Sequence, residues 1–169
     1  MKDMLSRKII AIAVVFFLGS FNYCSAQNKT TGLTEAQVMD LVNNKQFQFL
    51  AQYMVPTGGR SKVLTENYTV NVSPEEVSAD LPYVGRAYQA PINPADVGIR
   101  FVSKEFNYEE KKGKKDSWEI TISPKDGKDV RSCMFTIYPN GNANLMVNSN
   151  NRQAISYSGV IKTLQKKTQ

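Results

Sequence analysis

The chain has 169 residues, of which 41% are hydrophobic and 21% are charged, and its formal net charge is +6 at neutral pH. It contains no histidine, which excludes Ser-His-Asp and Cys-His catalysis and the usual Cys/His zinc sites. Carboxylate catalysis remains, but the adjacent pairs Glu75-Glu76 and Glu109-Glu110 would point to opposite faces of a strand. The sequence also lacks a Gly-rich phosphate loop and a calcium loop. We therefore expect a protein that is not an enzyme and that uses no metal or cofactor.

Residues 1–26 have the pattern of a cleaved secretory signal peptide. A positively charged start precedes an apolar run of ten residues, Ile9–Leu18, and Cys24-Ser25-Ala26 then forms a small-x-small cleavage site. Ten apolar residues span about 15 Å as a helix, which is roughly half of a bilayer core. We expect an exported or periplasmic protein whose mature chain begins at Gln27 and has no transmembrane segment.

Cys24 allows a second interpretation, in which it is the lipid-modified first residue of a lipoprotein. Such signals usually carry a leucine three positions before the cysteine and a small residue immediately before it, whereas Phe21 and Tyr23 stand there. Cleavage after Ala26 is therefore favoured, and it leaves Cys133 as the single cysteine of the mature chain. Because a lone cysteine has no disulfide partner, we expect Cys133 to be a buried, inert thiol on a strand.

The mature chain divides into a polar linker over residues 27–32, a single β-rich domain over residues 33–164 and a basic tail over residues 165–169. Basic residues gather in two runs, Lys111–Lys115 and Lys162–Lys167. The first run is typical of a hairpin tip and the second of a solvated tail, and no basic helix accompanies them. We expect no nucleic-acid partner.

One helix is predicted near the start of the domain, over about Glu35 to Asn44. Thr34 and Gln37 have the spacing of a capping box, and Leu33 and Val38 that of a hydrophobic staple. From Phe47 onward, apolar residues recur every second position, which is typical of half-buried strands.

About eight strands follow, joined by short turns that are rich in Gly, Pro, Asn and Asp. The clearest hairpin signal is Asn140-Gly141, because both central positions of a type I′ turn need positive φ. With no helical crossover, the strands should form an antiparallel meander.

The sequence therefore predicts an α+β fold that is mostly antiparallel β, with the helix and the strands curled into a barrel or half-barrel. Such a sheet is either filled by side chains or holds one small ligand. Ordinary core packing is the favoured role of the aromatic residues expected to face inward. These residues are Phe47, Phe49, Tyr53, Tyr68, Phe101, Trp118 and Phe135.

The stretch from Leu81 to Pro91 is the best candidate for a binding site. Tyr83, Arg86 and Tyr88 together could clamp an anion or a sugar, since a guanidinium offers five donors and tyrosines offer stacking faces. The alternative is a rigid corner between strands, with Arg86 inward, mostly buried and bonded to carbonyls or an acid. We favour the corner.

Several pieces of the chain match one family of exported bacterial proteins. They are Phe47-Gln48-Phe49-Leu50-Ala51, Pro56-Thr57-Gly58-Gly59, Leu81-Pro82-Tyr83-Val84-Gly85-Arg86-Ala87-Tyr88, Gly98-Ile99-Arg100-Phe101, Asn140-Gly141-Asn142-Ala143 and Ser156-Tyr157-Ser158-Gly159. On these pieces the chain resembles the "domain of unknown function 4251" family over nearly all of its mature length. The resemblance implies a one-domain periplasmic or envelope protein of a Gram-negative bacterium. It brings no known activity, so no catalytic residues carry over.

The sequence leaves three functions open. Two of them are described here, and the third is a hydrolase that would use carboxylates alone. The first is an exported binding module that holds a small apolar or amphipathic ligand inside the curled sheet, with Trp118 reporting on the interior. The second is an envelope protein with a filled core that binds a protein or glycan partner through a sheet edge or through Tyr83, Arg86 and Tyr88. The residues expected to bind a ligand or partner are Tyr83, Arg86, Tyr88 and Trp118.

Overall fold

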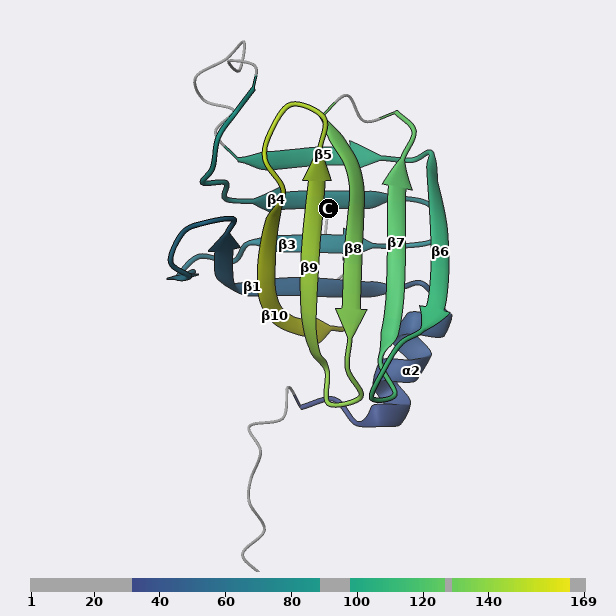
Figure 1. Ribbon diagram of the computed structural model, residues 1–169. Helices are drawn as coiled ribbons and strands as arrows, with labels where there is room; N and C mark the ends of the chain where they lie inside the picture. The colour runs from purple at the N-terminus through teal and green to yellow at the C-terminus, as the bar shows by residue number, and fades with distance from the viewer. Residues whose placement is uncertain (1–31, 89–97, 127–128, 165–169) are drawn as a thin grey trace, which may run out of the picture.

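Figure 1 shows a computed structural model of the chain, which describes residues 32–88, 98–126 and 129–164. The expected signal peptide with Cys24, most of the linker, the basic tail, and Pro91 and Pro94 lie outside the described residues. No helix in the described part is long and apolar enough to cross a membrane.

The helix α2 spans Glu35–Asn43, as the capping signal predicts. The Thr34 side chain accepts a hydrogen bond from the Gln37 backbone N–H at 3.3 Å, and the Thr34 backbone N–H donates to Gln37 Oε1 at 2.8 Å. Val38 and Val42 are fully buried, so this face of the helix covers the core. After the helix, the Lys45 ammonium lies 4.8 Å from the centre of the Tyr108 ring.

Ten strands form a single sheet in which every named pair is antiparallel. Their order is β5-β4-β3-β1-β10-β9-β8-β7-β6, with β2 paired to β1 beside this path. The strands are β1 (Phe47–Pro56), β2 (Lys62–Val63), β3 (Thr69–Val72), β4 (Val77–Leu81), β5 (Ile99–Ser103), β6 (Phe106–Lys112), β7 (Trp118–Pro124), β8 (Val130–Ile137), β9 (Asn142–Ser149) and β10 (Ile155–Lys162).

The sheet curls into a barrel shape because its two halves run in different directions. In Figure 1, β1, β3, β4 and β5 cross behind β6 to β10. Phe135 of β8 packs edge-on against Phe47 and Phe49 of β1, with ring centroids 5.6 and 5.9 Å apart. These three rings join the two halves through the core. The prediction of an α+β, mostly antiparallel fold is confirmed, and the described residues form ten strands where about eight were expected.

Tyr53 was expected to face inward, and this prediction is wrong. The pairing of β1 with β10 shifts register between Ala51 and Tyr53, which is a β-bulge. An extra residue in a strand moves every later side chain to the opposite face. Ala51 and Met54 are therefore buried, whereas Tyr53 is 46% exposed on the outer face.

The hairpin at Asn140-Gly141 is confirmed, but its turn is not type I′. Tyr138 O accepts from the Gly141 N–H at 2.9 Å, which places Pro139 and Asn140 at the centre of the turn. Gly141 has φ of 78°, and Asn140 is not among the described residues with positive φ. Proline fixes φ near −65° and so favours a type I turn followed by a left-handed glycine.

Cys133 is fully buried in the core, as predicted from its strand position. Burial raises the pKa of the Cys133 thiol to about 12, because the thiolate would lose its hydration. The thiol is therefore protonated at neutral pH, which makes it a poor nucleophile.

Candidate functional site

The corner after β4 is built around the side chain of Tyr83, which is 9% exposed. Its hydroxyl lies 3.0 Å from Arg86 O and 3.1 Å from Gln153 O, so its single O–H is shared between carbonyls on two separate segments. Gln153 N–H also donates to Arg86 O at 3.0 Å. These bonds fix the corner to the segment that precedes β10. Burial raises the pKa of Tyr83, so its hydroxyl stays protonated as a donor at neutral pH.

Gly85 is required at this corner because the Tyr83 ring passes directly beneath it. A Cβ at position 85 would lie 2.5 Å from Tyr83 Oη and 2.8 Å from the ring carbon Cζ. Any larger residue would displace the tyrosine from its two carbonyl partners. The compact LPYVGRAY stretch is thus explained by one buried tyrosine and the glycine that covers it.

An open groove separates the corner from the turn after β1. The Thr57 hydroxyl donates to Ala154 O at 2.8 Å, so this wall is also bonded to the segment before β10. The groove has a volume of about 540 Å³, against about 450 and 470 Å³ for two other surface hollows lined by described residues. Its lining consists of Pro56, Thr57, Gly58, Gly59, Arg60, Lys62, Val84, Gly85, Arg86 and Gln153.

All the charged residues that line the described groove are positive. Arg60 and Lys62 come from the β1 side and Arg86 from the corner, and no acidic residue is among the lining residues. All three side chains are exposed. Within the described residues, no hydrogen bond or ion pair involves their charged groups. Among the described residues, they can therefore bind an anion without first losing a partner.

Arg86 was expected to be inward and mostly buried, and this prediction is wrong. Its backbone carbonyl holds the corner, while its side chain is exposed and lines the groove. The buried arginine of this region is Arg152, whose side chain is only 15% exposed. Arg152 pairs with Asp129 at 3.2 Å and donates to Gly98 O at 2.9 Å.

The guanidinium of Arg152 also occupies the tyrosine face that Arg86 would contact in the clamp alternative. It lies 5.3 Å from the centre of the Tyr83 ring, within the range of a cation–π contact. Sequence reasoning missed Arg152 because it follows Asn148–Asn151, a polar turn where an arginine is ordinarily solvated. The sequence feature that could have drawn attention to Arg152 is that it is the one Lys or Arg between Arg131 and Lys162.

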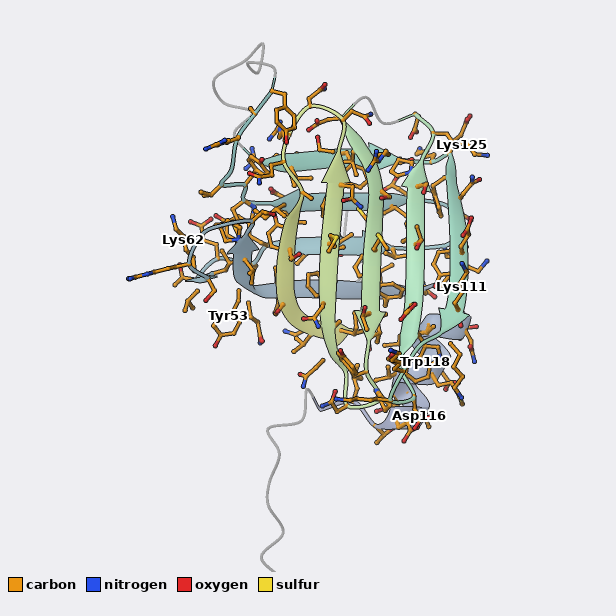
Figure 2. The ribbon with its side chains drawn as sticks, viewed as in Figure 1. Tyr53, Lys62, Lys111, Asp116, Trp118 and Lys125 are labelled. Atoms are coloured by element: carbon orange, nitrogen blue, oxygen red, sulfur yellow. The ribbon has the colours of Figure 1, made fainter. Side chains whose placement is uncertain are left out.

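Of the four expected site residues, only Arg86 is among those that line the groove, and Tyr83 lies beneath the corner beside it. Tyr88 is 70% exposed, and its backbone N–H donates to Asn151 O at 2.8 Å. Trp118 is half-buried against the core at the start of β7. In Figure 2 it lies at the lower right beside α2, whereas Tyr53 and Lys62, on the groove side, lie at the left. The structure thus brings Tyr83 and Arg86 together and leaves Trp118 apart.

Replacing Tyr83 by phenylalanine is expected to lower the free energy of unfolding by about 1–2 kcal/mol, because Gln153 O loses its donor within a packed corner. Urea unfolding followed by circular dichroism measures this change. Tyr53→Phe is the matched control, because Tyr53 is half-exposed on the outer face, and it should change the free energy by less than about 0.5 kcal/mol. Equal effects of the two substitutions would contradict the assigned role of the Tyr83 hydroxyl.

This chain is a small α+β protein with a barrel-shaped antiparallel sheet, a covering helix and a cationic groove beside the corner held by Tyr83. The sequence profile described as "Domain of unknown function (DUF4251)" matches residues 29–161. The chain therefore belongs to the DUF4251 family.

A solved structure supports the same fold. The crystal structure of a DUF4251 family protein from Bacteroides eggerthii DSM 20697 is similar with a TM-score of 0.56 at 15% sequence identity. The alignment covers 76% of this chain and 87% of that chain. No curated protein matches the chain.

Proposed function

We propose that this protein is a non-enzymatic binding module of the cell envelope that holds an anionic group of a partner in the groove between the β1 turn and the corner. The observation that carries the proposal is the set of three exposed cations, Arg60, Lys62 and Arg86, around a hollow whose described lining contains no acidic residue. The apolar run Ile9–Leu18 and the cleavage site after it support export.

The chemistry of the groove suits a carboxylate or phosphate group carried by a glycan or protein. Arginine binds both groups in a bidentate manner, and lysine adds a point charge. Pro56 and Val84 supply apolar wall area beside the cations. The walls are each hydrogen-bonded to residues 153–154, so the groove is pre-organised and a ligand does not need to order it.

A filled interior favours this surface function over a ligand inside the sheet. Phe47, Phe49, Phe135 and Tyr157 are each at most 2% exposed, and the three phenylalanine rings are in contact. Two acidic groups that could have served carboxylate catalysis already have structural partners. Asp126 accepts from Ser103 and Asp129 pairs with Arg152.

The test uses Arg86→Gln and a carboxylated glycan fragment, oligogalacturonate, with its neutral methyl ester as the matched ligand. We expect the charged form to bind at least tenfold more tightly than the ester, and Arg86→Gln to weaken its binding about tenfold or more, because a charged hydrogen bond contributes roughly 1.5–3 kcal/mol. Isothermal titration calorimetry at two salt concentrations measures both effects, and binding should weaken with salt.

Arg131→Gln is the control variant, because Arg131 is an exposed arginine on β8 outside the groove and the change in net charge is the same. It should leave the affinity unchanged. Arg86→Gln should also leave the free energy of unfolding unchanged within about 0.5 kcal/mol. Equal weakening by the two variants, or equal affinity for acid and ester, would overturn the proposal.

A further inference from the structure

The outer face of the sheet carries a second feature, separate from the groove. Nine large hydrophobic side chains among the described residues are exposed, and five of them lie on adjacent strands of this face. We call these five the outer patch: Tyr53, Val55, Val63, Met134 and Met146, with exposures of 46, 39, 69, 45 and 44%. Isolated exposed hydrophobic residues are ordinary, but a contiguous group of them marks an interaction surface.

Strand register places the members of the outer patch on one face, with a serine of β10 between the two methionines and the residues of β1. Met134 pairs with Met146, Met146 with Ser156, and Ser156 with Val55, in one row across β8, β9, β10 and β1. Tyr53 lies two residues from Val55 on the same strand and pairs with Val63 of β2. In Figure 1 this surface of β8, β9 and β10 faces the viewer, away from the other half of the sheet.

The residues that separate the members of the outer patch are polar but uncharged. Thr136 pairs with Asn144, Asn144 with Ser158, and Ser158 with Tyr53, in a row parallel to the first. Charged side chains lie at the margins of this face, which are marked by Glu119 on β7, Arg131 on β8, Lys162 on β10 and Lys62 on β2. Depletion of charge with exposed Met and Tyr is the composition of an interface centre.

We propose that the outer patch is a self-association surface, on which two copies of the chain pack sheet to sheet about a two-fold axis. The charge distribution selects this occupant. The chain from Gln27 onward lacks Lys2, Arg7, Lys8 and Asp3, so its net charge is +4 instead of +6. Two positive copies repel each other, and a face without charged side chains is where they can meet without like-charge contact. Ser, Thr and Asn both donate and accept hydrogen bonds, so a face built from them is complementary to a copy of itself.

The size of the outer patch predicts a weak dimer. Adjacent strands are about 4.8 Å apart, so five strands span roughly 20 Å, and the patch offers on the order of 500 Å² on each copy. A stable complex usually buries about 800 Å² on each partner. We therefore expect association that depends on concentration in the micromolar range or above.

Sedimentation equilibrium of a chain beginning at Gln27, which contains the whole described sheet, tests the proposal. Over about 10 µM to 1 mM, the weight-average mass should rise from one copy toward two. Added salt should strengthen the dimer, because it screens the repulsion between two positive chains while the contact itself is uncharged. Met146→Glu should raise the dissociation constant at least tenfold, since it places two like charges near the axis.

Val102→Glu is the matched control, because Val102 is 63% exposed on β5 and lies outside the outer patch. It should not change the dissociation constant, and Met134→Lys should weaken association as Met146→Glu does. Unfolding temperatures confirm that each variant remains folded. A wild-type chain that stays monomeric at 1 mM overturns the proposal and leaves the patch to a different partner. Equal effects of Met146→Glu and Val102→Glu also overturn it.

Discussion

Replacing Gly159 by alanine is expected to lower the free energy of unfolding by about 3 kcal/mol or more, because overpacking against backbone cannot be relieved by a side-chain rotation. Gly159 pairs with Ala51 where β10 meets β1. A Cβ at position 159 would lie 2.0 Å from Leu50 O and 2.9 Å from Leu50 C. The two strands would have to separate at the place that joins the halves of the sheet. Urea unfolding of both proteins measures the loss.

Gly59→Ala provides the control for the Gly159 substitution. A Cβ at position 59 would meet only Pro56 Cβ at 3.4 Å, which is an ordinary contact, and Gly59 does not have positive φ. The change should therefore be neutral or stabilise the protein by up to about 1 kcal/mol. A Gly159→Ala protein as stable as Gly59→Ala would show that the strand pair can relax, contrary to the close approach described here.

Replacing Phe135 by alanine is expected to cost about 3–5 kcal/mol of the free energy of unfolding, the range for an aromatic side chain removed from a core. Phe135 is 2% exposed and contacts both Phe47 and Phe49 edge-on, so its loss leaves a void between the two halves of the sheet. Because typical domains are stable by only 5–15 kcal/mol, this single change could remove most of the stability. Thermal and urea unfolding measure it.

Met134→Ala is the matched comparison, because Met134 is the preceding residue on the same strand and is 45% exposed on the outer face. It should cost less than about 1 kcal/mol, since little buried area is lost. Measurements at low micromolar concentration keep self-association out of this comparison. Similar losses for Met134→Ala and Phe135→Ala would contradict the assignment of inner and outer faces on β8.

The sequence carried enough information to predict most of the fold. The capping pair Thr34 and Gln37 located the helix, and period-two alternation located the strands, because both signals depend on residues close together in the chain. Tyr53 was assigned to the wrong face because a β-bulge depends on the partner strand and leaves no local signal. The turn at Asn140-Gly141 was misassigned because Pro139 outweighs the Asn-Gly preference.

The candidate site was predicted less well, since it depends on contacts between distant segments. Tyr83 and Arg86 were placed in one corner because only two residues separate them, but only Arg86 lines the groove. Their roles were set by Gln153 and Arg152, which approach from nearly seventy residues further along the chain. Arg152 fills the buried position, and this leaves the Arg86 side chain to the groove. Pairings of this kind cannot be read from local composition or spacing.

The pairing of β1 with β10 also has a consequence for how the chain reaches its native state. Gln48 pairs with Lys162, so the first long strand stays without its main neighbour until almost all of the chain is available. Such long-range pairing gives a high contact order, which slows folding because loop-closure entropy must be overcome first. During synthesis from the N-terminus, β1 cannot pair with β10 until β10 has been made. The sheet is therefore incomplete while the chain is still being synthesised. Late folding of this kind suits a polypeptide that must remain unfolded during passage through a narrow pore.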